Sequence, residues 1–321
     1  MKICLGIDVG SVTTKFAALD EDDQLIASLY KRTMGRPIAM VQDGLKEIAA
    51  SIPPDAEIVA VGTTGSARYL AGVIVGADVV KNEITAHAVG ALKYVPDVQT
   101  IMEIGGQDSK IIILRDGIVT DFAMNTVCAA GTGSFLDQQA MRLNMKIEEF
   151  GWRALESKNP VRIAGRCTVF AESDMIHKQQ MGHRIEDILY GLCEALVRNY
   201  LNNIGLGKEM LSPVVFQGGV AFNDAIIRAF SESLKTEIVV PPHHEVMGAI
   251  GAAILAREEV GSRNNGSQFK GFAISEADYR TSSFECKACA NMCEIAQISL
   301  DGKAVARWGG RCDMWERTSV G

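Results

Sequence analysis

The strongest constraint on this fold is an internal repeat. Residues 2–30 have the order strand, Gly/Asp/Ser turn, lysine, strand, short turn and third strand, and residues 100–124 have the same order. The first turn is Asp8-Val-Gly-Ser-Val-Thr-Thr-Lys15 and the second is Gly105-Gly-Gln-Asp-Ser-Lys110. A repeat at roughly 95 residues implies that the chain consists of two related halves.

Alternating strands and helices follow each copy of the repeat. Apolar residues at helical spacing predict helices, and short β-branched runs predict strands. The expected helices are residues 38–50, 82–94, 186–204 and 245–257, and the expected strands are residues 58–62, 213–216 and 237–241. This alternation is typical of an α/β protein.

Changes in composition suggest four segments. We expect a first subdomain over residues 1–97, a second over 98–257, a linker over 258–283 and a separate cysteine-rich module over 284–321. The expected linker is rich in Gly, Ser, Asn and Arg, and the module holds four of the eight cysteines.

Charge and hydropathy narrow the possible functions. The formal net charge of −7 argues against nucleic acid or an acidic membrane as a general partner, although it leaves room for a local basic patch. No apolar run has the length of a membrane span. The apolar run at the N-terminus, interrupted by Asp8, is too short for a signal peptide, so we expect a cytoplasmic protein. Eight cysteines in that setting favour metal or redox roles over structural disulfides.

The two repeated turns are candidates for phosphate binding. The sequence lacks the usual mononucleotide loop and the usual dinucleotide loop. Either turn alone could be an ordinary hairpin, but a repeated pair with glycine-rich segments downstream favours a nucleotide site. The residues expected to bind ATP are Gly10, Ser11, Thr13, Lys15, Gly105, Gly106, Gly218, Gly219 and Gly248.

Acidic and amide residues of the same turns suggest phosphoryl chemistry. We expect Asp8 and Asp108 to be catalytic and to hold Mg²⁺ largely through its water molecules, which is how this ion is commonly bound. Gln107 would orient the attacking water molecule.

Two cysteines lie at predicted helix starts. Cys128 precedes a Gly/Thr/Ser turn and a helical pattern, and Cys167 precedes a second helical pattern. Free N–H groups and the helix dipole favour a thiolate or a bound anion at such positions. By contrast, Cys4 and Cys193 lie in apolar stretches and are expected in the core.

Six motifs together resemble a known family. The motifs are Gly6-Ile-Asp-Val-Gly-Ser11, Asn82-Glu-Ile-Thr-Ala-His-Ala88, Ile104-Gly-Gly-Gln-Asp-Ser-Lys110, Cys128-Ala-Ala-Gly-Thr-Gly-Ser-Phe-Leu136, Arg166-Cys-Thr-Val-Phe-Ala-Glu-Ser-Asp174 and Gly218-Gly-Val-Ala221. They resemble the activators of 2-hydroxyacyl-CoA dehydratases and benzoyl-CoA reductases, a BadF/BadG/BcrA/BcrD-type family of the actin/Hsp70/sugar-kinase ATPase superfamily. The likeness covers about residues 1–257 and implies duplicated ribonuclease-H-like domains.

The resemblance also implies cofactors and partners. It implies a homodimer in which Cys128 and Cys167 of both chains hold one bridging [4Fe-4S] cluster, beside ATP/ADP and Mg²⁺. Ferredoxin or flavodoxin would donate single electrons, and ATP hydrolysis would drive them to an iron-sulfur acceptor enzyme. That acceptor would be a 2-hydroxyacyl-CoA dehydratase, a benzoyl-CoA reductase or a double-cubane-cluster protein.

The C-terminal segment departs from the family pattern. Its cysteines, Cys286, Cys289, Cys293 and Cys312, have the spacing C-x2-C-x3-C-x18-C. Asp301-Gly302 lies between two short strand patterns and predicts a hairpin turn. A zinc ribbon, a second iron-sulfur cluster and a module without metal all remain open.

Two other functions are compatible with an ATPase fold. A small-molecule kinase would need a catalytic base beside a substrate pocket, and it leaves the two helix-start cysteines without a role. A nucleotide-switched scaffold would need no chemistry beyond binding.

Overall fold

The protein forms two compact units. The computed structural model describes residues 1–125, 127–263, 266–300, 302–312 and 314–315. Residues 1–10, 14–81 and 252–321 form the N-terminal unit, and residues 11–13 and 82–251 form the central unit. The boundary at residue 82, rather than at the expected residue 98, reflects helix α3 (Glu83–Tyr94), which packs on strands of the central unit.

The N-terminal unit contains a five-stranded sheet with the order β3-β2-β1-β4-β5. Its strands are β1 (Lys2–Val9), β2 (Thr13–Leu19), β3 (Leu25–Arg32), β4 (Glu57–Thr64) and β5 (Val79–Val80). Strand β1 is almost wholly buried, as expected for a central strand whose apolar residues are nearly continuous. Helices α1 (Pro37–Ser51) and α2 (Arg68–Val75) contribute to the same apolar core.

The central unit contains a second sheet of five strands with the order β10-β9-β6-β7-β8. Its strands are β6 (Thr100–Ile104), β7 (Ser109–Arg115), β8 (Ile118–Asn125), β9 (Val214–Gln217) and β10 (Ile238–Val239). In both sheets an antiparallel hairpin is followed by parallel strands in the same spatial order. The predicted duplication is therefore confirmed.

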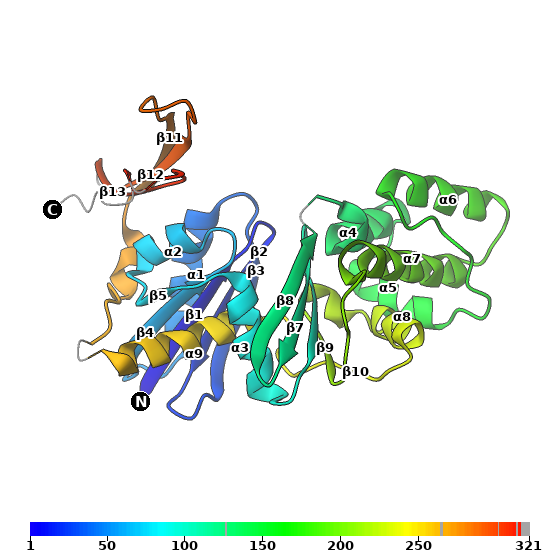
Figure 1. The fold of residues 1–321 in the computed structure, drawn as a ribbon, viewed down its shortest axis with the longest axis horizontal. Helices are drawn as coiled ribbons and strands as arrows, with labels where there is room; N and C mark the ends of the chain where they lie inside the picture. Colours follow the sequence, from blue (N-terminus) through cyan, green and yellow to red (C-terminus); the bar gives the residue numbers. More distant parts are fainter. Residues whose placement is uncertain (126, 264–265, 301, 313, 316–321) are drawn as a thin grey trace. The chain divides into compact units, whose positions relative to one another are not determined.

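A helical segment between β8 and β9 carries both helix-start cysteines. It consists of a 3₁₀ turn (Ala129–Gly131), α4 (Gly133–Arg142), α5 (Ile147–Leu155), α6 (Thr168–Gln180), α7 (Ile185–Tyr200) and a π-helical turn (Leu201–Gly205). A 3₁₀ turn (Gly219–Phe222) and α8 (Asp224–Leu234) follow β9. Figure 1 shows α4, α5, α7 and α8 on one face of the second sheet. Cys193 of α7 is fully buried there, and Cys4 of β1 is 3% exposed, as predicted for core cysteines.

The C-terminal part of the chain, from residue 252, belongs to the N-terminal unit. Helix α9 (Met247–Ser262) is followed by a 3₁₀ turn (Phe272–Glu276) and by an antiparallel sheet of β11 (Tyr279–Glu285), β12 (Glu294–Leu300) and β13 (Lys303–Trp308). The region expected as a linker, 258–283, is thus partly helix and strand. Its apolar side chains explain this, because Phe269, Phe272 and Ile274 pack against the core of the unit. The predicted turn between β12 and β13 includes Asp301, which lies outside the described residues.

Asp78 connects residues 267 and 268 to strand β4 by hydrogen bonds. One carboxylate oxygen accepts hydrogen bonds from the Val61 N–H at 2.8 Å and the Ser267 hydroxyl at 2.7 Å. The other accepts one from the Gln268 N–H at 2.7 Å. The side chain therefore joins strand β4 to residues more than 180 positions further along the chain.

Replacing Asp78 by alanine is expected to loosen the C-terminal segment. Three hydrogen bonds to a buried carboxylate are lost, so the free energy of unfolding should fall by about 3 kcal/mol. Urea denaturation measures the loss, and limited proteolysis should show earlier cleavage near residues 266–270. Asp55→Ala, at an exposed position, is the control. Equal stability of the two variants would contradict the fastening role.

Within the described part of the chain, no helix has both the length and the apolar character needed to cross a membrane.

Candidate functional site

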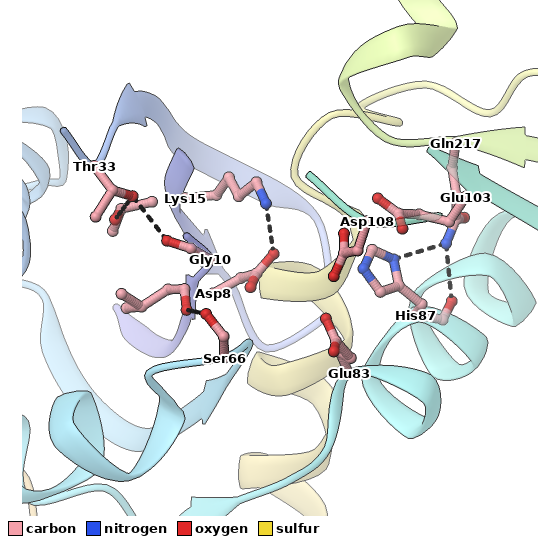
Figure 2. Close-up of polar contacts among 12 residues, drawn as sticks. Asp8, Gly10, Lys15, Thr33, Ser66, Glu83, His87, Glu103, Asp108 and Gln217 are labelled. Carbon is pink, nitrogen blue, oxygen red and sulfur yellow. Dashed lines mark hydrogen bonds and ion pairs between the residues drawn. The ribbon is translucent and has the colours of Figure 1, made fainter. Parts of the chain in front are cut away.

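The first predicted phosphate hairpin joins β1 to β2 and places two site residues in contact. Asp8 and Lys15 face each other in the strand register, and Lys15 Nζ lies 2.9 Å from Asp8 Oδ2 (Figure 2). Asp8 is 4% exposed. The Thr33 hydroxyl donates to the Gly10 carbonyl at 2.9 Å and fixes the start of the turn. The structure therefore brings together a carboxylate and an ammonium group, which the sequence predicts to act on the same bound nucleotide.

Gly65 lies against the same carboxylate. Its φ is +90°, and an added Cβ would lie 2.5 Å from Asp8 Oδ1. Only glycine adopts this backbone conformation readily and leaves the Asp8 side chain undisturbed.

The second hairpin contains a buried lysine held by three carboxylates. Lys110 of β7 is 2% exposed, and its Nζ lies 2.9 Å from Glu103 Oε2, 3.1 Å from Asp108 Oδ1 and 3.2 Å from Glu83 Oε2. Glu103 lies on β6, Asp108 on the turn and Glu83 at the first residue of α3. The Asn82 side chain caps that helix by accepting from the Thr85 N–H at 2.9 Å.

These charges alter one another's protonation. Burial alone would lower the pKa of Lys110, but the charges of Glu103, Asp108 and Glu83 raise it above its ordinary value. Burial raises the pKa of Glu83, and the Lys110 charge offsets this in part. Three carboxylates around one ammonium leave this group with a net negative charge, and the ammonium already occupies the space between them.

The remaining predicted residues of this hairpin lie on its turn. Gly105, Gly106 and Gln107 connect β6 to β7, and Gln107 is exposed. An exposed amide beside a carboxylate can reach a water molecule, which fits the role that the sequence suggested for Gln107.

The predicted adenosine loop follows β9 and requires glycine. Gly218 has a φ of +94°, and an added Cβ would lie 2.6 Å from the Ile104 carbonyl oxygen and 2.8 Å from Glu103 Oε1. Its N–H donates to the His244 carbonyl at 2.9 Å. Gly219 begins the following 3₁₀ turn. The loop therefore lies directly against the lysine–carboxylate group of the same unit.

Two buried polar residues, Gln217 and His87, contact each other, and Gln217 directly precedes this loop. Gln217 Nε2 lies 2.9 Å from His87 Nδ1, and both side chains are buried (Figure 2). Gly248 lies near the start of α9, whose small residues pack closely on a backbone as the sequence predicted. An added Cβ at Gly251 would lie 1.8 Å from the Ala86 carbonyl oxygen of α3.

The structure places Cys128 and Cys167 at adjacent helix starts. Cys128 is the residue before the 3₁₀ turn that leads into α4, and Cys167 is the residue before α6. Cys128 Sγ lies 4.0 Å from the carbonyl oxygen of Arg166, the residue next to Cys167. Both cysteines are partly exposed and unpaired by disulfides.

Two asparagines hold this arrangement. The Asn125 side chain accepts from the Cys128 N–H at 2.9 Å and donates to the Cys128 carbonyl at 2.7 Å. Asn199 of α7 donates to the Gly165 carbonyl at 2.6 Å, and its Nδ2 lies 3.9 Å from Cys128 Sγ. Asn199 thus connects the segments that carry the two thiols.

A direct link joins the cysteine segment to the second phosphate hairpin. The N–H groups of Gly133 and Ser134, at the start of α4, donate to the carbonyls of Gly105 and Gly106 at 2.8 Å each. The Ser134 hydroxyl also donates to the Gly106 carbonyl. These bonds satisfy helix N-terminal donors that would otherwise lack partners.

Three C-terminal cysteines, Cys286, Cys289 and Cys293, lie on the segment between β11 and β12. The fourth, Cys312, follows β13. The Cys286 N–H donates to the Cys293 carbonyl at 2.8 Å, whereas Cys289 and Cys312 are exposed. Trp315 Nε1 donates to Cys286 Sγ at 3.3 Å, and this bond lowers the pKa of the Cys286 thiol. In the portion of the chain that the structure describes, no group of three or more His, Cys, Asp or Glu residues has an arrangement that could hold a metal ion.

Sequence reasoning missed several residues of these sites. Glu83 and Lys110 lie in two of the six motifs, whose pattern assigns them no role, and Glu103 lies in a predicted strand. The sequence did contain a signal for this pair: Glu103 is an acidic residue in an otherwise apolar strand, and Lys110 follows the repeated turn. Asn199 gave no signal, because it occurs within a strongly apolar helix pattern.

With this geometry established, the chain can be placed in a family. The BadF/BadG/BcrA/BcrD ATPase family matches residues 5–256, and the chain belongs to that family. The C-terminal sheet lies beyond the match.

Individual relatives support the assignment. The (R)-2-hydroxyglutaryl-CoA dehydratase activating ATPase of Acidaminococcus fermentans is 35% identical over 78% of this chain and 96% of its own. The activator of the 2-hydroxyisocaproyl-CoA dehydratase from Clostridium difficile with bound ADPNP has a TM-score of 0.72 and 33% identity, covering 81% of this chain and 96% of that one. A ROK family glucokinase from Streptomyces griseus shares the fold with a TM-score of 0.50 at 13% identity, covering 80% of this chain and 99% of that chain. The predicted actin/Hsp70/sugar-kinase type of fold is confirmed.

Proposed function

We propose that this protein is an ATP-hydrolysing reductive activator. It receives single low-potential electrons from ferredoxin or flavodoxin and passes them through a [4Fe-4S] cluster to an iron-sulfur dehydratase or reductase. The observation that carries the proposal is the pair of hydrogen bonds from the start of α4 to Gly105 and Gly106. They give the predicted phosphate hairpin a mechanical connection to the segment that holds Cys128.

In each unit the phosphate hairpin supplies the nucleotide contacts, and the glycine loop adds to those of the central unit. Lys15 contacts phosphate oxygens, and Asp8 and Asp108 hold Mg²⁺ largely through its water molecules. Gln107 orients the attacking water molecule. The bound ADPNP of a relative with 33% identity supports ATP and ADP as the ligands.

A cluster shared by two copies fits the cysteine pair. Two thiols on neighbouring segments supply half the ligands of a four-cysteine cluster, so a two-fold dimer would complete the set. Large apolar side chains are exposed beside them, namely Val127 at 95% and Val169 at 66%. Exposed apolar side chains next to an incomplete ligand set are consistent with a surface that a second copy covers. The cluster supplies one-electron chemistry, and the chain holds it with Cys128 and Cys167.

Nucleotide state then controls the cysteine segment. Gly105 and Gly106 are the expected phosphate contacts, and their carbonyls orient α4, which begins five residues after Cys128. A change in the hairpin on ATP binding or hydrolysis is therefore passed to α4 and to the thiol. In a kinase reading, the adjacent thiols would have no part in the chemistry.

Gly133→Ala tests this coupling. An added Cβ would lie 2.9 Å from the Gly105 carbonyl oxygen, so α4 must separate slightly from the hairpin. In the wild-type protein ATP should change the rate of iron removal by a chelator at least about fivefold, which is the lower range of allosteric coupling. We expect the variant to keep its cluster and to lose most of that response.

Ser134→Ala is the milder companion, because it removes the hydroxyl bond and keeps the backbone bonds. Visible spectra confirm that each variant holds the cluster before chelation begins. A full ATP response in Gly133→Ala would contradict coupling through α4.

The C-terminal cysteines form a separate proposal. Cys286, Cys289, Cys293 and Cys312 are candidate ligands for zinc or for a second iron-sulfur cluster, and metal analysis of the protein distinguishes these two from a module without metal.

A further inference from the structure

A basic groove lies beside the cysteine pair. It encloses about 1090 Å³, and eight of its twelve lining residues have polar or charged side chains. Its cations are Arg162, Arg166, Lys178 and Arg198, and its single carboxylate is Asp174. All of these residues belong to the central unit, on the loop before Cys167, on α6 and on α7.

The charges of the groove are largely uncompensated. Asp174 accepts a hydrogen bond from the Ala164 N–H at 2.8 Å, and Arg198 lies 3.6 Å from Glu194. Among the described residues, no ion pair is found for Arg162, Arg166 or Lys178. Three such cations in one groove are unusual in a chain of net charge −7, and a positive concavity attracts an acidic partner.

One residue that lines the groove, Asn199, lies close to Cys128, a proposed cluster ligand. Asn199 lines the groove, and its Nδ2 lies 3.9 Å from Cys128 Sγ. Arg166, at the same surface, precedes Cys167 directly. A molecule bound here would therefore lie next to Cys128 and to the residue before Cys167, as an electron donor requires.

The character of the lining favours a protein over a small molecule. Small-ligand pockets are lined mostly by apolar and aromatic side chains, whereas most of the residues that line this groove are polar or charged. Arginines around an exposed aromatic side chain, here Phe170 at 67% exposure, are typical of protein interfaces.

We propose that this groove is the docking site for an acidic one-electron carrier protein. The inference rests on the proposed function, because it assigns a place to the donor of that reaction. One electron leaves the reduced carrier and enters the cluster, and no bond forms or breaks. Opposite charges steer the carrier to the groove and increase the association rate.

The test is charge reversal in the full-length protein. Arg162→Glu combined with Lys178→Glu should slow cluster reduction by a reduced acidic ferredoxin at least about tenfold at low salt and flatten its dependence on ionic strength. Stopped-flow absorbance follows the reduction. Reduction by titanium(III) citrate reports whether the cluster itself is intact.

A matched variant controls for net charge. Lys146→Glu with Lys235→Glu changes two exposed residues of the same unit outside the groove, and it should behave as the wild type. Unchanged ferredoxin rates in the groove variant would overturn the proposal. Loss of the dimer with unchanged ferredoxin binding would assign the groove to the contact between copies and would also overturn it.

A binding measurement separates this inference from the proposed function. Titration calorimetry with oxidised ferredoxin does not depend on electron transfer. Affinity that falls at least about tenfold in the groove variant supports the docking site even if no cluster is found. Equal affinity for the wild type and the groove variant rejects the docking site even if the cluster is present.

Discussion

Replacing either Cys128 or Cys167 by serine is expected to abolish the bridging cluster. Each substitution removes two of four thiolates in a symmetric dimer, and a serine hydroxyl is a poor ligand for iron at neutral pH. The anaerobically purified variant should lose the brown absorbance and the electron paramagnetic resonance signal of the reduced protein. Folding should be retained, because both side chains are partly exposed and neither belongs to the core.

The experiment requires a background without the C-terminal thiols. Cys286, Cys289, Cys293 and Cys312 are changed to serine first, since they could bind iron themselves. Cys193→Ala, which removes a fully buried thiol from α7, serves as the control and should keep the full signal. A complete cluster signal in the Cys128 or Cys167 variant would refute the ligand assignment.

Replacing Lys110 by methionine is expected to have the largest effect on stability. Glu103, Glu83 and Asp108 would be left close together without the buried ammonium between them. Removing one partner of a buried ion pair costs about 3–5 kcal/mol in unfolding free energy. ATP hydrolysis should also fall, because Asp108 loses the contact that fixes its carboxylate.

The stability loss should depend on pH. Burial already raises the pKa of Glu83 above 4.5, and removal of Lys110 raises it further. A carboxyl whose pKa is higher in the folded state keeps its proton where the unfolded chain has lost it, so folding stability falls as pH rises through that interval. The difference between variant and wild type should therefore be smaller near about pH 5 than near about pH 8.

Two further variants serve as a control and as a test of the charge network. Lys235→Met changes an exposed lysine of the same unit and should match the wild type. Glu103→Gln added to Lys110→Met removes one buried charge and should restore at least about 1 kcal/mol, as expected for directly interacting residues. A Lys110→Met protein as stable as the wild type at every pH would contradict the buried charge network.

Much of the fold could be predicted because local patterns agreed with one another. The repeated hairpins predicted two sheets, and the apolar spacing placed α1, α3 and α7 within a few residues of their observed bounds. The 258–283 region was less predictable. Its Gly, Ser and Asn content resembles a linker, but Asp78 supplies three hydrogen bonds from a distant strand, and sequence spacing carries no record of such contacts.

The candidate site was predictable where chemistry and local structure coincide. Asp8 and Lys15 flank the first turn and Asp108 lies on the second, and the composition of both turns already suggested phosphate binding. Partners that arrive from other elements were not predictable. Glu83 comes from α3 and Asn199 from α7, and only the tertiary fold brings them to Lys110 and Cys128. The basic groove was likewise hidden, because its cations come from a loop and two helices.

The most direct test of the account is metal stoichiometry in the variant that lacks the four C-terminal thiols. Iron and sulfide are measured anaerobically beside the mass of the assembly in solution. The account predicts about four irons and four sulfides for every two chains, in a dimer whose visible absorbance bleaches in oxygen. A colourless dimer, or a monomer that carries a full cluster, would contradict a cluster shared through Cys128 and Cys167.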